Sequence, residues 1–210
     1  PKSVQTVLLA IKPQMFDRLG PNLGTALPPQ AMIVSILAGT NLRTLNKAFD
    51  GRVVVRAMPN TPASIGAGIS AIYANPEIHP EKLDEAEALL KPGGDVVRVD
   101  SEVALNAVTA ISGSGPAYIF HLVEALEAGA RDLGLPDDVA AQLARKTVVG
   151  AAKLLDASED TPETLRKNVT SPNGTTQAAL DVLMGEDGGL SKMMIKTVRA
   201  AFTRAKELAS

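Results

Sequence analysis

Short apolar runs alternate with amphipathic stretches over the first hundred residues, and this alternation constrains the fold more than any other feature. The runs at 6–12, 31–39 and 52–59 are apolar at nearly every position, and proline or glycine closes each. Continuously apolar strands are typical of parallel sheets covered on both faces. Further strands are expected at 69–74 and 95–100, and helices at 13–23, 41–49 and 80–90. The pattern predicts an α/β domain over residues 1–100, with a partial doubly wound parallel sheet.

The pattern changes at Glu102, beyond which only helices are expected. The last helix, 190–208, carries an apolar stripe wider than one neighbouring helix can cover. Its members are Leu190, Met193, Met194, Thr197, Val198, Ala201, Phe202, Ala205 and Leu208. Large exposed apolar patches are rare in monomers. Residues 101–210 are therefore predicted to form an all-α dimerisation domain.

Composition narrows the classes of function. The net charge is −2, basic and acidic residues are interspersed, and only two Tyr and four Phe are available for base stacking, so no nucleic-acid partner is expected. No apolar run is long enough for a membrane span. The chain lacks cysteine, which excludes thiolate chemistry and fits a cytoplasmic location. The two histidines, His79 and His121, are too few for most transition-metal sites, and no metal is expected.

Three of the expected strands end in residues suited to ligand binding, which in doubly wound sheets occurs beyond the carboxyl ends of the strands. Lys12 follows the first strand in "AIKP", and small residues end the second in "ILAG". Asn60 and Thr61 lie between prolines in "RAMPNTP". Each motif also has a purely structural interpretation. Lys12 can be a solvated surface lysine, "ILAG" a tight strand-to-helix turn, and Asn60 with Thr61 an Asx turn.

The "GSGP" stretch at 113–116 is not interpreted as a dinucleotide fingerprint. It lacks the third glycine and follows a helix instead of a strand, so a tight helix–helix turn is expected. A glycine-rich phosphate loop would follow the first strand of such a domain. The chain opens with "PKSVQ" and enters a strand almost at once, so an upstream βα unit that carries this loop is expected to be missing.

A cluster of hydroxyl and turn residues precedes one helix in "NVTSPNGTTQAAL", Asn168 to Leu180. A helix start offers unpaired backbone N–H groups and partial positive charge, which together suit a small anion. The alternative is ordinary capping of the helix by a Ser or Thr side chain.

Together, "AIKP", "ILAG", "RAMPNTP", "SGSGPAY" and "NVTSPNGTTQAAL" resemble, in order and spacing, the pyrroline-5-carboxylate reductase family. The resemblance covers essentially the whole chain, and the last motif is the specific one. It implies NAD(P)H-dependent reduction of 1-pyrroline-5-carboxylate to L-proline, the final step of proline biosynthesis, on a Rossmann-like domain. It also implies a homodimer that assembles further, typically into a decamer built as a pentamer of dimers. The family's first strand and glycine-rich loop have no counterpart here, so the choice between NADPH and NADH stays open.

The resemblance also implies roles for individual residues. Thr176 is the implied catalytic residue, with its hydroxyl near the ring nitrogen of the substrate. The other implied substrate-binding residues are Glu102, Glu159, Ser171, Gly174 and Thr175, the last through its backbone. The implied cofactor-binding residues are Ala10, Ile11, Lys12, Pro13, Ile36, Leu37, Ala38, Asn60, Thr61 and Asn168. For the two glutamates, the alternative is that acidic residues are common at helix starts.

Two other interpretations remain open at this point. One is a related imine or β-hydroxyacid oxidoreductase, but those families usually place a catalytic Lys or His among the helices. Here Lys146 and Lys153 have ordinary surface spacing, and His121 has no obvious polar partner. The other is a non-catalytic dimerisation module, against which the intact cluster of residues 171–176 argues.

Overall fold

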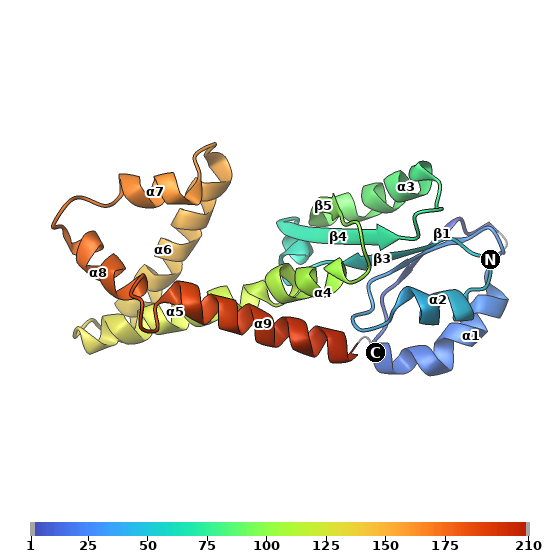
Figure 1. The fold of residues 1–210 in the computed structure, drawn as a ribbon, viewed down its shortest axis with the longest axis horizontal. Coiled ribbons are helices and arrows are strands. Elements are labelled where there is room, and N and C mark those ends of the chain that lie inside the picture. The colour runs from blue at the N-terminus through green and yellow to red at the C-terminus, as the bar shows by residue number, and fades with distance from the viewer. Residues whose placement is uncertain (1–2, 209–210) are drawn as a thin grey trace. The chain divides into compact units, whose positions relative to one another are not determined.

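A five-stranded sheet forms the core of the first half of the chain (Figure 1), in a computed structural model that describes residues 3–208. The strands lie in the order β1-β2-β3-β4-β5. Their bounds are β1 Thr6–Leu9, β2 Met32–Ser35, β3 Val54–Met58, β4 Gly68–Ala74 and β5 Gly94–Arg98. Neighbours are parallel except β3 and β4. The expected α/β sheet is confirmed as parallel-dominant and not wholly parallel.

The antiparallel pair follows from the length of its connection. Residues 59–67 between β3 and β4 contain only a 3₁₀ turn, η2 (Thr61–Ile65). A parallel crossover needs a dozen or more residues, usually including a helix, so the chain can only turn back. The apolar pattern of a strand carries no information about its direction, and the sequence interpretation missed this reversal.

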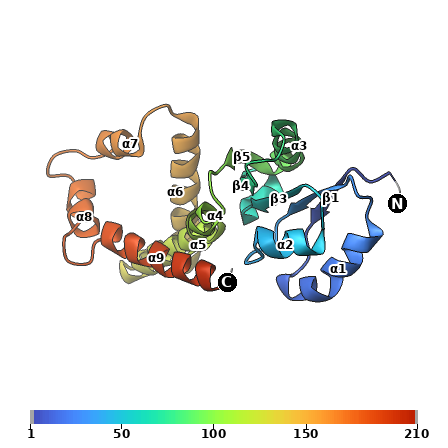
Figure 2. The ribbon, with the colours of Figure 1, turned by 45° about the vertical axis from the view of Figure 1, so that its right-hand side comes forward.

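Helices cover both faces of the sheet, as Figure 2 shows. On one face, α1 (Phe16–Ala26) and α2 (Leu42–Ala48) pack Phe16, Leu45 and Phe49 against Leu9 and Ile33 of the sheet. On the other face, α3 (Pro80–Leu90) covers a second apolar cluster from β2, β3 and β4. The short 3₁₀ turns η1 (Pro13–Met15) and η3 (Lys91–Gly93) precede α1 and β5.

Helices α1 and α2 approach each other closely at Gly24. A Cβ atom there would lie 2.0 Å from the carbonyl oxygen of Ala48, so no side chain fits. Arg52 stabilises the end of α1 near this contact. Its Nη2 donates to the carbonyl oxygens of Gly24 (2.8 Å) and Leu27 (2.6 Å), and its Nε donates to the carbonyl oxygen of Pro28 (3.0 Å). The guanidinium thereby satisfies carbonyls that the end of α1 leaves without intrahelical partners.

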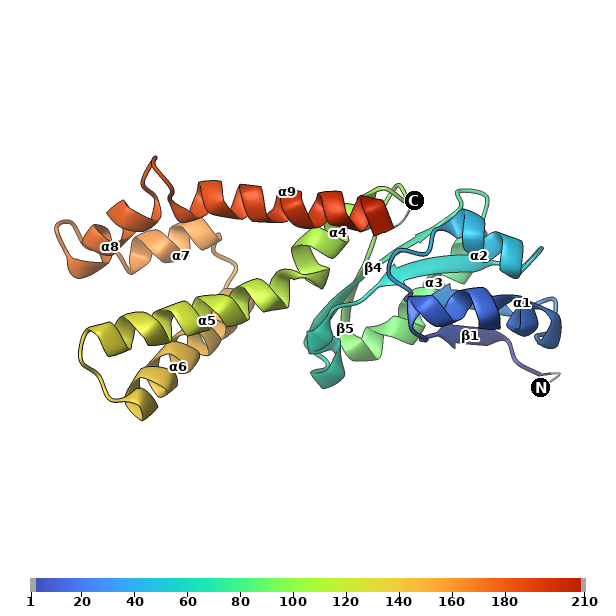
Figure 3. The same ribbon diagram turned by 90° about the horizontal axis from the view of Figure 1, so that it is seen from below.

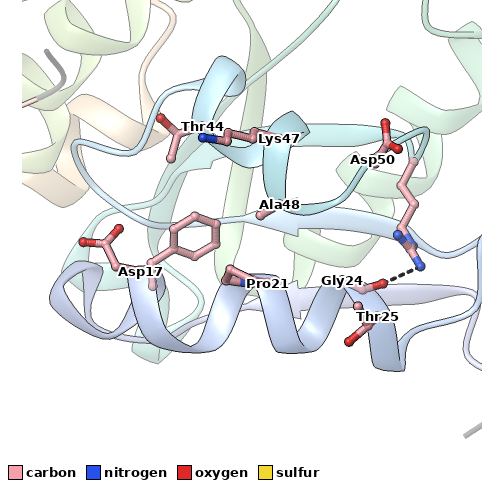
Figure 4. A pocket seen from close by; sticks show the side chains of 10 residues that line it. Asp17, Pro21, Gly24, Thr25, Thr44, Lys47, Ala48 and Asp50 are labelled. Carbon is pink, nitrogen blue, oxygen red and sulfur yellow. Dashed lines mark hydrogen bonds between the residues drawn. The ribbon is translucent and has the colours of Figure 1, made fainter.

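A surface groove of about 540 Å³ lies between these two helices (Figure 4). Pro21 and Gly24 line it from α1, and Lys47 and Ala48 from α2. None of the predicted site residues lines this groove.

The remaining helices are α4 (Ala104–Val108), α5 (Gly115–Asp132), α6 (Asp137–Ala157), α7 (Pro162–Asn168), α8 (Thr175–Leu183) and α9 (Leu190–Leu208). The described residues form two compact units. The first unit consists of residues 3–116 with residues 198–208, and the second unit consists of residues 117–197. Figure 3 shows α5 turning back into α6 within the second unit. The end of α9 thus belongs to the first unit, where a Cβ on Gly39 would lie 2.7 Å from the carbonyl oxygen of Leu208.

The "GSGP" stretch is not a tight turn between helices, as the sequence interpretation expected. A π-helical turn, Thr109–Gly113, links α4 directly to α5. The Ser114 N–H donates across five residues to the Thr109 carbonyl (2.8 Å). The hydroxyls of Thr109 and Ser112 donate to the carbonyls of Leu105 (2.8 Å) and Val108 (3.1 Å). The Leu105 carbonyl also accepts from the Thr109 backbone N–H, so backbone bonding continues into the π-helical turn and the helix widens without breaking.

The second unit exposes many large apolar side chains. Its buried apolar residues include Ala140 and Ala144, which are small, whereas Phe120, Leu143 and Val182 are 63%, 51% and 78% exposed. Such a surface is typical of a subunit that is completed by association. Within residues 3–208, none of the helices combines the length and apolarity needed to span a bilayer.

Candidate functional site

The carboxyl ends of three parallel strands lie at one edge of the sheet. Leu9 of β1 pairs with Ser35 of β2, and the Ile36 N–H donates to the Leu9 carbonyl (3.2 Å). The residues that follow β1 and β2 therefore lie next to each other at this edge. They are two groups of predicted cofactor residues: Ala10, Ile11, Lys12 and Pro13 after β1, and Ile36, Leu37 and Ala38 after β2. Lys12 and Ala38 are exposed there, and Leu37 is buried.

The second of these connections turns sharply at Gly39. Its φ of 75° lies in the left-handed region that glycine adopts without a steric penalty. Helix α2 then begins after Asn41, whose side chain accepts from the Thr44 N–H (2.8 Å), as expected for a capping residue. Ala38 is small and exposed, whereas Gly39 lies against the Leu208 carbonyl at the end of α9.

Asn60 and Thr61 follow β3 at the same edge. The Oδ1 atom of Asn60 accepts from the Ile69 N–H (3.0 Å) and closes the loop between β3 and β4. Thr61 is the first residue of η2, and its carbonyl accepts from the Ser64 hydroxyl (3.0 Å). The Asn60 side-chain oxygen therefore stabilises the loop between β3 and β4.

Glu102 forms a buried contact within the first unit. Its Oε1 accepts from the Arg56 Nη1 (2.8 Å) and from the Leu42 N–H (2.5 Å). The Arg56 side chain is only 8% exposed, and that of Glu102 is 31% exposed. The carboxylate thus neutralises a guanidinium in the middle of β3 and caps the first residue of α2.

Helix α8 begins without a side-chain cap. Its N-cap residue is Gly174, and no side chain among residues 3–208 caps the helix there. Asn173 before it adopts φ 59°, and the Gly174 N–H donates to the Ser171 carbonyl (3.1 Å). A Cβ on Gly174 would lie 2.4 Å from the Ser171 Oγ, so this hydroxyl lies directly against the helix start. Thr175 and Thr176 are the first two residues of the helix, exposed and half-buried respectively.

The other two predicted residues of the second unit flank α7. Glu159 lies exposed in the connection before α7, and Asn168 is the exposed last residue of that helix. Seven helical residues span about 10 Å, so the two lie at opposite ends of α7. The predicted site residues therefore form one group in the first unit and one in the second. Among residues 3–208, His, Asp and Glu form no group that could hold a metal ion.

Comparisons with known proteins identify the family. A family model described as pyrroline-5-carboxylate reductase dimerisation matches residues 102–208. A pyrroline-5-carboxylate reductase from Synechocystis is 44% identical over 97% of this chain and 75% of its own length. The chain belongs to the pyrroline-5-carboxylate reductase family. A reductase from Pseudomonas aeruginosa is 41% identical over 97% of this chain and 74% of its own.

Solved structures agree with this membership. A pyrroline-5-carboxylate reductase from Coxiella burnetii superposes with a TM-score of 0.92 at 36% identity, covering 100% of this chain and 77% of its own. A Plasmodium falciparum pyrroline carboxylate reductase with NADP bound shares the fold, with a TM-score of 0.85 at 24% identity over 100% of this chain and 79% of its own. The matched dimerisation region covers α4 to α9, so this member of the pyrroline-5-carboxylate reductase family is a homo-oligomer.

Arg56 is the residue that the sequence interpretation missed. A guanidinium in an apolar strand needs a buried acceptor, because an unpaired buried charge is very costly. The single charge inside "VVVRAM" was a signal for such a partner. Its partner Glu102 lies 46 residues further along, and the strand alone could not identify it.

Proposed function

We propose that this chain catalyses the NAD(P)H-dependent reduction of 1-pyrroline-5-carboxylate to L-proline. The observation that carries the proposal is the glycine-started helix α8, in a chain that belongs to the pyrroline-5-carboxylate reductase family. Its first-turn N–H groups have no side-chain cap among the described residues, and the Ser171 hydroxyl lies against them. Such a start suits a small carboxylate, which the substrate carries.

The substrate carboxylate binds at Gly174 and the Thr175 backbone in this proposal, and Ser171 adds a hydroxyl hydrogen bond. The Thr176 hydroxyl is then assigned to the ring nitrogen as the catalytic residue. An imine that arrives protonated needs no strong general acid, so orientation and charge complementarity carry the reaction. Glu159 and Glu102 are assigned to the substrate as anionic groups that favour a cationic iminium.

The dinucleotide is assigned to the carboxyl edge of β1, β2 and β3. The exposed Ala38 and the exposed Lys12 fit a ligand that runs along this edge. When bound there, NAD(P)H would supply the hydride for C5 of the imine. Residues 10–13, Ile36, Leu37, Asn60 and Thr61 would hold this cofactor, and the family resemblance adds Asn168.

Assembly and location are part of the same proposal. The exposed apolar side chains of the second unit support a homodimer. A decamer built as a pentamer of dimers, and a cytoplasmic location, are predictions from the family resemblance. Light scattering on the purified protein, over a range of concentrations, measures the size of the assembly.

The deciding experiment follows the nicotinamide absorbance of NADPH and NADH after 1-pyrroline-5-carboxylate is added to the natural full-length protein. Rapid substrate-dependent oxidation with L-proline as product is expected, and the two rates identify the preferred cofactor. Cofactor binding without oxidation would instead indicate another imine or hydroxyacid substrate. Absence of both would indicate a non-catalytic dimerisation module.

Ser171→Ala is expected to raise the KM for 1-pyrroline-5-carboxylate about five- to tenfold and to change kcat little. The variant removes one hydrogen bond to a charged group, which is worth somewhat more than about 1 kcal/mol. Steady-state kinetics at saturating cofactor measure the effect. Ser191→Ala, at an exposed serine of α9, is the matched control and should behave as the parent. A parental KM for Ser171→Ala would remove Ser171 from the carboxylate site.

A further inference from the structure

Arg56 is a charged residue in β3, a central strand of the sheet. Arg56 lies in β3, where it pairs with Ser35 of β2 on one side and Tyr73 of β4 on the other. Its side chain is 8% exposed, and its guanidinium forms an ion pair with Glu102. A well-packed apolar pair would often stabilise such a strand at least as well as a buried ion pair. The charge pair therefore calls for an explanation other than stability.

The single carboxylate oxygen that Arg56 holds also connects two further elements. Oε1 of Glu102 accepts from the Leu42 N–H, the first amide of α2, while Glu102 itself stands two residues before α4. Helix α2 has only seven residues, so its start depends on external partners. The segment directly before it contains Ile36, Leu37 and Ala38, which are assigned to the cofactor. Arg56 thus fixes a carboxylate that in turn fixes the end of the cofactor segment.

The second carboxylate oxygen remains available. Within residues 3–208, Oε2 of Glu102 accepts no hydrogen bond, and the Glu102 side chain is 31% exposed. One oxygen is anchored by a guanidinium and a backbone amide, and the other can face a ligand. A carboxylate held in this way keeps one orientation. It can therefore stabilise a cationic reaction centre without having to reorient during the reaction.

We propose that Arg56 is a positioning residue for the reduction, acting through Glu102 to set both the carboxylate and the start of α2. This inference rests on the proposed function, because it assigns the anchored carboxylate to the imine substrate and the α2 start to the cofactor segment. Arg56 itself touches neither ligand. Its effect on catalysis passes entirely through Glu102.

A double-variant cycle tests this dependence. Arg56→Met is expected to lower kcat/KM for 1-pyrroline-5-carboxylate about 100-fold, since a displacement of about 1 Å at a site can have that effect. Glu102→Gln is expected to cause a comparable loss, and the double variant should be no worse than Glu102→Gln alone. Arg56→Lys keeps the charge without the planar fork and should fall between Arg56→Met and the parent. Losses that multiply in the double variant, or parental kinetics in Arg56→Met, would overturn the proposal.

A second readout is independent of turnover. Hydrogen exchange at the Leu42 amide should be faster in both Arg56→Met and Glu102→Gln, because each releases the acceptor of that amide. Unchanged exchange in Arg56→Met would contradict the coupling even if activity fell. If the parent protein itself does not reduce 1-pyrroline-5-carboxylate, the proposed function fails, and the exchange data still test the Arg56–Glu102–Leu42 connection.

Arg52→Met is the matched control. Arg52 precedes the same strand and donates hydrogen bonds to the end of α1, and no contact between it and Glu102 is recorded among the described residues. Its loss should lower the thermal stability without a selective change in kcat/KM of the folded protein or in Leu42 exchange. A purely structural role for Arg56 would make Arg56→Met behave in the same way as this control.

Discussion

Thr176→Val is expected to lower kcat for imine reduction about 100-fold, the effect of removing one well-placed hydrogen-bonding group from a reaction centre. Thr176 is the second residue of α8 and half-buried, so its hydroxyl is held by a regular helix and not by a mobile loop. Valine has nearly the same shape, and the backbone N–H groups that are assigned to the carboxylate remain. The KM for 1-pyrroline-5-carboxylate should therefore change much less than kcat.

Steady-state kinetics and thermal unfolding, measured on the same preparations, separate chemistry from folding. Thr176→Ser keeps the hydroxyl and should retain most of the parental kcat. Thr203→Val, at an exposed threonine of α9, makes the same chemical change elsewhere and should leave both kcat and Tm unchanged. Parental turnover in Thr176→Val would exclude the Thr176 hydroxyl from the mechanism.

Gly24→Ala is expected to lower the free energy of unfolding by about 3 kcal/mol, at the upper end of what an added methyl group costs in a packed site. The new Cβ would lie 2.0 Å from the Ala48 carbonyl oxygen, which belongs to the backbone and cannot rotate away. Helices α1 and α2 would have to separate, and the bonds from Arg52 to the end of α1 would stretch. In an open helix the same change would instead stabilise the protein by roughly 0.5 to 1 kcal/mol, so the sign of the effect is diagnostic.

Urea unfolding at one fixed protein concentration measures this loss as a lower midpoint with an unchanged m-value. Thr25→Ala, at the adjacent and exposed residue of α1, is the control and should shift stability by less than about 0.5 kcal/mol. A stabilised Gly24→Ala variant would show that α1 and α2 are not in close contact at this point in solution.

Local patterns predicted the elements better than the connections between them. The runs 31–39 and 52–59 contain β2 and β3, because burial on both faces leaves a continuous apolar signature. The helix at 41–49 begins as expected, with Asn41 capping α2 through an interaction that lies within three residues. The direction of β4 was not predicted, since it depends on the length of a loop. The π-helical turn at Thr109–Gly113 was missed because glycine and serine suggest a break when their hydrogen-bond partners are unknown.

In the candidate site, too, the local motif was predictable from the sequence and the long-range contact was not. The motif that contains Ser171 and Gly174 is local, and its sequence already indicated a helix start suited to an anion. The pairing of Arg56 with Glu102 joins residues that are 46 positions apart, and only the folded sheet brings them together. The roles of Glu159 and Asn168 at opposite ends of α7 remain predictions that rest on the resemblance.

The division of α9 between the two compact units has a consequence for synthesis on the ribosome. The first unit is discontinuous in sequence, because residues 198–208 pack with residues 3–116. The intervening stretch, 117–197, takes roughly 4 to 16 s to translate at about 5 to 20 residues per second. During that interval Leu208, which packs against the turn at Gly39 in the folded protein, has not yet been synthesised. The sheet domain therefore cannot complete its packing at Gly39 until the last residues of α9 have been synthesised.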